Sequence, residues 1–241
     1  TAVLAIHGHG LGKALLCGSV VGGPGDDYAH QLARAGHLVF VPDLRGFGER
    51  ADHDIGGKYH CDWNLVCATM AGVVPLARNL WDLRCALDYL TAHPLVARDR
   101  VATVGLSYGG TCSLFLAALD DRVAAVVVSG YLSSWRAAHT VPWNMCGSQV
   151  LPGQLGAVEH LDLAALIAPR PLLVESGTED VIFPVAAAVR TVADLRKVYA
   201  ALAAPQHALV HSIFAGDHRW HGVDVEPFLR TALESERTPD R

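Results

Sequence analysis

The chain has 241 residues, of which 51% are hydrophobic and 18% are charged, and its formal net charge is −5. This composition excludes an intrinsically disordered chain, which would have few apolar residues and a high net charge. Lys and Arg form no cluster that would attract nucleic acid or an anionic membrane surface, and no apolar run approaches the roughly 18 residues of a membrane span. We therefore expect a single domain over residues 1–241 with no nucleic-acid partner and no membrane partner.

Short apolar runs rich in β-branched residues alternate along the chain with longer amphipathic stretches. The short runs are almost continuously apolar, as expected for strands that are buried on both faces. The alternation predicts an α/β fold, with a doubly wound, mostly parallel sheet of about six strands and helices on both faces. The predicted strands are Ala2–Ile6, Leu38–Val41, Val101–Gly105, Val123–Ser129, Pro171–Glu175 and Ala208–Phe214.

Helical periodicity is clearest where five leucines follow one another at spacings of four, three, four and three residues. Such spacing forms one apolar stripe along a helix. The stripe consists of Leu76, Leu80, Leu83, Leu87 and Leu90. Further helices are predicted over residues 27–35, 109–119, 161–167, 184–203 and 225–234.

Two long irregular stretches, 46–74 and 131–156, interrupt this order. Loops longer than about 12–15 residues in a compact domain are usually lids or binding loops. We therefore expect both stretches to be insertions that form the walls of a pocket. Trp143, in the second stretch, is a candidate for the pocket lining.

The six cysteines form no CxxC pair. A domain of this size needs no disulfide framework, so we expect free and mostly buried thiols. The N-terminal segment has no basic start, and His7 and His9 break its apolar run, so it does not resemble a signal peptide. We therefore expect a cytoplasmic protein, and a mature secreted form stays open as the alternative.

A G-x-S-x-G motif, Gly105 to Gly109, stands between the third predicted strand and a predicted helix. In this setting the motif is typical of a nucleophile elbow, a sharp turn that holds the serine in strained backbone geometry and leaves no room for larger residues at the glycines. The N-terminus of the next helix would favour a developing oxyanion. The sequence thus predicts Ser107 as a nucleophile; the alternative is a glycine-rich turn that contains a serine by chance.

A serine nucleophile requires a base that an acid orients, and behind a nucleophile elbow the acid precedes the histidine along the chain. Asp180 lies in the loop after the fifth predicted strand and is the favoured acid. Glu179 and Glu175 are rivals, although Glu175 still belongs to the strand run. Asp180 could also serve only as the cap of the following helix.

Two histidines, His218 and His221, follow the last predicted strand. We favour His218 as the base because it lies closer to the strand end, from which a short loop can return it to Ser107. Trp220 lies between them and is a further candidate for the pocket.

The first predicted strand ends in His7-Gly8-His9-Gly10. The loop at this place usually provides one oxyanion-hole N–H, and the residue after the serine, Tyr108, provides the other. We therefore predict oxyanion donors at Tyr108 and around His9. The alternative is a metal site, since His7 and His9 have ligand spacing, but further ligands do not follow. We expect no metal and no cofactor.

The second predicted strand is followed by Asp43-Leu44-Arg45-Gly46-Phe47-Gly48-Glu49. Arg45 could line the pocket. The interpretation we favour is that Arg45 braces the loop by pairing with Asp43 or Glu49.

These motifs, in this order and at this spacing, resemble the α/β-hydrolase superfamily. More narrowly, they resemble its acetyl xylan esterase and cephalosporin-C deacetylase-like branch, which borders the dienelactone hydrolases. The resemblance implies a triad of Ser107, Asp180 and His218, with the Tyr108 N–H and the loop around His9 as oxyanion hole. The usual first two strands of such a sheet are absent from this chain, and Asp217 stands where relatives often have glycine. The similar segments are HGHG at 7–10, DLRGFGE at 43–49, WDLRCALDYL at 81–90, GLSYGGT at 105–111, the stretch 162–184 and GDHRWHG at 216–222.

The sequence therefore predicts a serine carboxylic-ester hydrolase, similar to acetyl esterases, that cleaves small acyl esters through an acyl-enzyme. Its partner would be a small-molecule ester, which the resemblance suggests is an acetylated carbohydrate; the oligomeric state is left open. One alternative is a serine peptidase of the prolyl-oligopeptidase type, which shares G-x-S-Y-G-G but carries a propeller or similar gate that 241 residues cannot supply. The other is a non-catalytic binding protein on a hydrolase scaffold.

Overall fold

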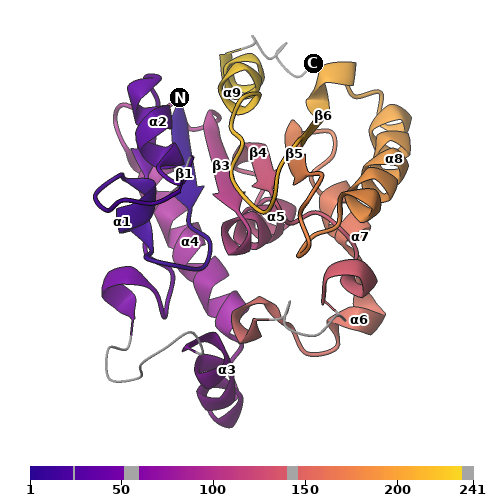
Figure 1. Cartoon of the computed structure of the whole chain (residues 1–241). Helices are drawn as coiled ribbons and strands as arrows, with labels where there is room; N and C mark the ends of the chain where they lie inside the picture. Colours follow the sequence, from indigo (N-terminus) through magenta and orange to yellow (C-terminus); the bar gives the residue numbers. More distant parts are fainter. Residues whose placement is uncertain (24, 52–59, 140–145, 235–241) are drawn as a thin grey trace.

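One six-stranded sheet organises the computed structural model, which describes residues 1–23, 25–51, 60–139 and 146–234. All neighbouring strands are parallel, in the order β2-β1-β3-β4-β5-β6 (Figure 1). Parallel neighbours need crossover connections, which the intervening helices provide. The predicted doubly wound α/β architecture is confirmed. The strands are β1 Ala2–Ile6, β2 Leu38–Phe40, β3 Val101–Leu106, β4 Val123–Ser129, β5 Leu172–Gly177 and β6 Leu209–Phe214.

Each face of the sheet has its own hydrophobic core. In β1, Leu4 and Ile6 belong to one core, whereas Val3 and Ala5 belong to the other. Successive side chains of a strand point to opposite faces, so burial on both sides explains the continuous apolar runs. The first core is closed by α4 (Pro75–Ala92), α5 (Tyr108–Leu119), α7 (His160–Ala165) and α8 (Val185–Ala201). The second is closed by α1 (Lys13–Leu16), α2 (Tyr28–Arg34) and α9 (Val225–Glu234).

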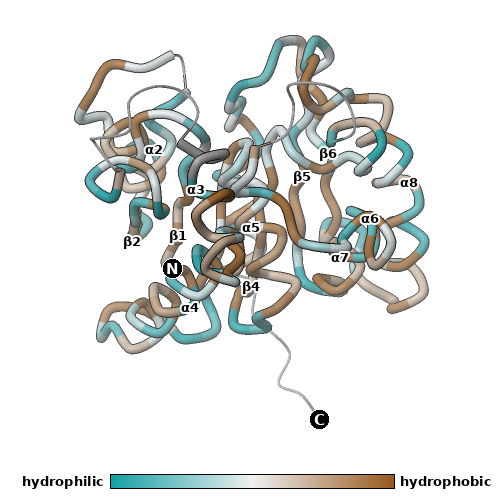
Figure 2. Tube along the Cα trace, turned by 90° about the horizontal axis from the view of Figure 1, so that it is seen from below, coloured by the Kyte–Doolittle hydropathy of each residue, from teal (hydrophilic) through white to brown (hydrophobic). Residues whose placement is uncertain are grey.

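The leucine stripe of α4 is buried along its whole length, as predicted. Each buried leucine contributes about 1.5–3 kcal/mol relative to an exposed one, so this stripe fixes α4 on the sheet. Trp81 and Tyr89 lie on its outer side and are exposed. In Figure 2 the hydrophobic colour is concentrated along α5 and the central strands, whereas the outer helices carry both colours. Over the described ranges, no helix is long and apolar enough to cross a membrane.

The stretch 46–74 differs from the predicted irregular loop, because it contains the short helix η1 (Gly48–Arg50) and the helix α3 (His60–Met70). Val66 and Met70 of α3 are exposed. Among residues 64–70, whose side chains the structure describes, the apolar residues of α3 form no buried stripe, which is the signal that sequence periodicity detects. The stretch 131–156 is largely irregular, with short helical turns at Trp135–His139 (η2), Gly147–Gln149 (η3) and Gln154–Ala157 (α6).

The described cysteines are free, but the expectation that most are buried is wrong. Of the cysteines that the structure describes, Cys112 alone is fully buried and Cys146 is partly covered, whereas Cys17, Cys67 and Cys85 are exposed. Cys85 lies in α4 beside the leucine stripe rather than in it, so the apolar pattern around it does not report its own burial.

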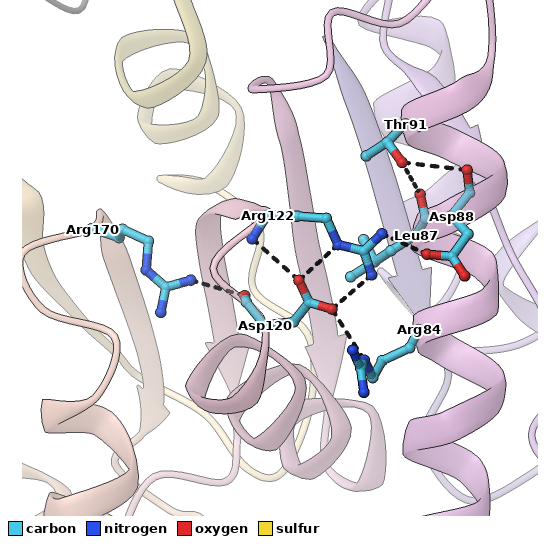
Figure 3. A network of polar contacts seen from close by, with 7 residues as sticks. All are labelled: Arg84, Leu87, Asp88, Thr91, Asp120, Arg122 and Arg170. Atoms are coloured by element: carbon cyan, nitrogen blue, oxygen red, sulfur yellow. Dashed lines mark hydrogen bonds and ion pairs between the residues drawn. The ribbon is translucent and has the colours of Figure 1, made fainter. Parts of the chain in front are cut away.

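At the amino ends of β4 and β5, an ion-pair network joins α4 to the end of α5 (Figure 3). Asp120 accepts hydrogen bonds from Nε and Nη2 of Arg122 at 2.8 and 2.7 Å and from Nε of Arg84 at 3.3 Å. Arg170, just before β5, donates to the carbonyl oxygens of Asp120 and Val123. The hydrogen bond from Arg122 is the main cause that lowers the pKa of Asp120, so this carboxylate stays charged in the folded protein.

Candidate active site

Ser107 lies in the sharp turn between β3 and α5 and has φ 58° and ψ −117°. A non-glycine residue rarely adopts positive φ, and such strain persists only where the surroundings hold it. Here the N–H of Ser107 donates to the carbonyl oxygen of Ser129 on β4 at 3.0 Å, and its carbonyl accepts from Thr111 at 2.9 Å. The motif is therefore a nucleophile elbow in its backbone geometry.

Close packing explains the glycines around the serine. A side chain at Gly105 would overlap with the backbone of Gly109, and one at Gly109 would overlap with the carbonyl of Ile6 at the end of β1. A Cβ at Gly8 would lie 3.4 Å from the Cβ of Ser107. The loop after β1 therefore passes directly beside the serine.

His218 and Asp180 form a hydrogen-bonded pair. Nδ1 of His218 lies 2.8 Å from Oδ2 of Asp180. The other oxygen of the carboxylate, Oδ1, accepts the N–H groups of Ile182 and Phe183, both at 2.8 Å. Because an ionised carboxylate only accepts hydrogen bonds, it orients the ring with the proton on Nδ1. Nε2 is then the free basic nitrogen, and it is buried without a hydrogen-bond partner in the described structure.

A cavity of about 440 Å³ is lined by both Ser107 and His218. Ser107, His218 and His9 all line it, and the ring of His218 passes within 3.1 Å of where a Cβ on Gly130 would lie, at the end of β4. Asp180 orients His218 from behind. The lining of the cavity also contains apolar side chains, among them Leu15, Leu106, Ile182 and Phe183, and the polar residues Asp26 and Gln149.

The predicted pocket walls are only partly found. Cys146 and Gln149, from the stretch 131–156, line the cavity that contains Ser107. The described residues of 46–74 do not; with Arg45 they line a separate cavity of about 460 Å³. The stretch 46–74 leaves the sheet at the outer strand β2, and its helix α3 packs against η3 and α4.

Arg45 is a bracing residue, but its partner is neither Asp43 nor Glu49. Nε and Nη2 of Arg45 bind both carboxylate oxygens of Asp82 in α4, at 2.7 and 2.8 Å. Burial opposes the charge on Asp82, yet the guanidinium groups of Arg45 and Arg50 outweigh it and lower the pKa of Asp82. Lys13 instead pairs with Asp43 and Glu49.

Trp220, one of the two tryptophan candidates, does not line this cavity in the described structure. Trp220 is buried and stacks on Tyr28, with ring centroids 4.1 Å apart. Tyr28 itself lines the cavity and donates its hydroxyl to the carbonyl of Ile6. Trp220 therefore supports a wall residue rather than forming the wall. Trp143 lies outside the described residues.

His7 is used for structure. Its Nε2 accepts the N–H of Leu44 at 2.9 Å and its Nδ1 donates to the carbonyl of Gly8 at 2.7 Å. Burial lowers the pKa of His7, which keeps the ring neutral. Both nitrogens are thus occupied in holding the loop after β1. In the ranges that the structure describes, no three His, Cys, Asp or Glu side chains are grouped to hold a metal ion.

His221 is not among the described residues that line the cavity of Ser107, and it stacks on Phe214 with ring centroids 4.5 Å apart. Glu175, the rival acid, is fully buried on β5 and accepts the N–H of Gly222 at 2.8 Å. Burial raises the pKa of Glu175. Glu175 therefore anchors the loop that carries His218, a role that sequence reasoning missed although a charged residue in an apolar strand run signalled it.

A cluster of aromatic rings packs against the ring of His218. The ring of Phe183 lies 5.6 Å from that of His218 and 5.3 Å from that of Tyr131. Tyr131 in turn packs against His139 and His160. Burial lowers the pKa of His139 to about 4 and that of His160 well below its ordinary value, so both rings are neutral near pH 7.

Comparisons with known proteins agree with this architecture. The model of the prolyl oligopeptidase family matches residues 26–220. The "Putative hydrolase YtaP" of Bacillus subtilis (strain 168) is 28% identical over 208 residues, which cover 83% of this chain and 67% of that protein.

Two solved esterase structures share the fold. A protein titled "putative acetyl xylan esterase", from Bacteroides fragilis NCTC 9343, has a TM-score of 0.72 at 22% identity, covering 89% of this chain and 58% of that one. The methylesterase BT1017 has a TM-score of 0.70 at 23% identity, covering 97% of this chain and 49% of that one. This chain thus spans about half the length of these two structures, and identities this low show a common fold alone. With its elbow, its six-stranded sheet and a family match over most of its length, the chain belongs to the prolyl oligopeptidase family of α/β-hydrolases.

Proposed function

We propose that the protein is a serine hydrolase of carboxylic esters, with Ser107 as nucleophile, His218 as general base and Asp180 as the acid that orients it. One observation carries the proposal: a serine in strained elbow geometry lines the same cavity as a histidine whose other nitrogen binds a buried carboxylate. A glycine-rich turn with a purely structural role would not require a histidine–carboxylate pair beside its serine. The arrangement matches the roles of a Ser-His-Asp triad.

In the proposed reaction, Nε2 of His218 takes the proton of the Ser107 hydroxyl while Oγ attacks the ester carbonyl carbon. The backbone N–H groups of Tyr108 and His9 would hold the resulting oxyanion, helped by the N-terminus of α5. The imidazolium then protonates the leaving alcohol, which leaves an acyl-enzyme. Water, activated by the same histidine, attacks the acyl-enzyme and releases the acid and Ser107.

We infer that the acyl group is short, as in acetyl esters. Leu106, Ile182 and Phe183 bring bulky apolar side chains next to the serine, which favours small acyl groups over long chains. Asp26 and Gln149 add polar groups to the same cavity that can bind a hydroxylated alcohol. The names of the solved neighbours, an acetyl xylan esterase and a methylesterase, support an ester substrate and suggest a carbohydrate alcohol.

The second candidate function is peptide hydrolysis, which the family match favours. The test compares kcat/KM for p-nitrophenyl acetate, butyrate and octanoate with that for dipeptide p-nitroanilides. We expect hydrolysis of the short esters and a fall beyond about four carbons, although each buried methylene could contribute about 0.8 kcal/mol where a pocket accepts it. Preference for the anilides would establish the peptidase instead, and preference for octanoate would refute the short acyl site.

A further inference from the structure

Asn79 is a buried polar residue that the proposed catalytic roles leave unused. It lies in α4 and is 1% exposed. A buried amide is tolerated when its donor and acceptor are both paired. Here Oδ1 accepts the N–H of Arg45 at 2.9 Å, and Nδ2 donates to the hydroxyl of Tyr108 at 2.8 Å. Asn79 therefore joins the turn after β2 to the first residue of α5.

The side chain of Tyr108 is fixed from several sides. It is fully buried, and its hydroxyl donates to the carbonyl oxygen of Ser148 at 3.1 Å while it accepts from Asn79. Its ring lies 5.3 Å from the ring of His9 and 5.9 Å from that of Phe47. The two residues whose N–H groups would form the oxyanion hole thus contact each other through their side chains, and Asn79 anchors one of them.

We propose that Asn79 is a positioning residue of the oxyanion hole, an inference that rests on the proposed ester hydrolysis. By holding the Tyr108 hydroxyl, Asn79 sets the direction of the Tyr108 backbone N–H relative to Oγ of Ser107. Such a donor must lie about 2.7–3.1 Å from the oxyanion, and a displacement of about 1 Å can slow a reaction roughly a hundred-fold. A side chain that never touches substrate can therefore control the rate.

The test breaks the same hydrogen bond from both sides, with Asn79→Ala and Tyr108→Phe. Each variant should lower kcat for p-nitrophenyl acetate by roughly ten- to a hundred-fold, with little change in KM, because the oxyanion forms only in the transition state. The double variant should be no slower than the slower single variant, since either change alone already removes the hydrogen bond between Asn79 and Tyr108. Arg78→Ala, at the exposed neighbouring residue of α4, is the matched control and should keep the wild-type kcat.

Rates are divided by the number of sites that a fluorophosphonate titrates, so that a loss of folded protein does not lower kcat. A wild-type kcat in Asn79→Ala, or losses that multiply in the double variant, would overturn the inference while ester hydrolysis by the wild type keeps the proposed function intact. If the wild type hydrolyses no ester, the proposed function fails. The coupling between Asn79 and the turn at Tyr108 is then measured by amide hydrogen exchange of residues 105–111. The exchange rates should rise in both variants, and unchanged rates in both would overturn the inference.

Discussion

The two ends of the parallel sheet use their polar groups in opposite ways. At the amino end, the carboxylate of Asp120 is bound by Arg122 and Arg84, so the protein satisfies its own charges (Figure 3). At the carboxyl end, Ser107 is held in strained geometry and Nε2 of His218 has no hydrogen-bond partner within the described structure. With the proposed function, this difference means that the first end contributes stability, whereas the second keeps groups ready for a substrate.

The largest effect should come from Ser107→Ala. We expect the loss of turnover to exceed a hundred-fold, because the nucleophile is removed, while the unfolding temperature stays close to that of the wild type. The measurement is kcat/KM for p-nitrophenyl acetate together with thermal unfolding. Residual activity above about a hundredth of the wild type would argue against Ser107 as nucleophile.

His218→Ala should be about as damaging as the serine change, because the two side chains act as a unit. The double variant Ser107→Ala/His218→Ala should be no worse than either single variant. His221→Ala is the matched control and should have a mild effect, since its ring stacks on Phe214 and is not among the described residues that line the cavity of Ser107. An inactive His221→Ala enzyme with an active His218→Ala enzyme would reverse the assignment.

At the opposite end, Asp120→Ala should lower stability and spare catalysis. Removing a nearly buried carboxylate that accepts several hydrogen bonds should lower the free energy of unfolding by about 1–3 kcal/mol, while kcat/KM of the folded enzyme stays at the wild-type value. Asp121→Ala, at the exposed neighbour, should change neither quantity. Denaturant unfolding and initial rates measure both; a fall in kcat/KM would show that the two ends are coupled.

The smallest effect is a difference in how the stability contributed by the two ends depends on pH. Folding lowers the pKa of Asp120, so its contribution is complete above the unfolded pKa and is lost only below about pH 4. Folding also lowers the pKa of His139 and His160, so the unfolded chain binds more protons below about pH 6.5 and stability falls from there towards the folded pKa values.

Unfolding temperatures measured between about pH 7 and pH 5 should therefore fall because of the histidines. His139→Phe, which keeps an aromatic ring beside Tyr131, should reduce that fall. If the unfolding temperature fell equally steeply with pH in the variant and the wild type, His139 would not contribute to the fall.

Sequence patterns predict the sheet well because its strands are buried on both faces. The predicted bounds Ala2–Ile6 and Val123–Ser129 agree with the structure, since a continuous apolar run leaves little freedom in where its strand begins and ends. The carboxyl ends of parallel strands meet at one edge, which is why motifs far apart in the sequence could be assigned to one site. Ser107 and His218 do line one cavity.

Contacts that depend on three-dimensional packing could not be predicted in the same way. The partner of Arg45 proved to be Asp82, which lies 37 residues away, because α4 crosses over the turn after β2. Asn79 lies within a helix whose leucine stripe dominates the pattern, so its bond to Tyr108 leaves no sequence signal. The helix α3 was missed because its described side chains, at residues 64–70, form no continuous buried stripe.

The reactivity of Ser107 is the central claim, and covalent labelling tests it most directly. The protein is treated with a fluorophosphonate, and the modified residue is located by peptide mass spectrometry. We predict one adduct per chain, on Ser107, with no adduct in Ser107→Ala and much slower labelling in His218→Ala. An unlabelled wild-type protein, or an adduct on another residue that persists in Ser107→Ala, would contradict it.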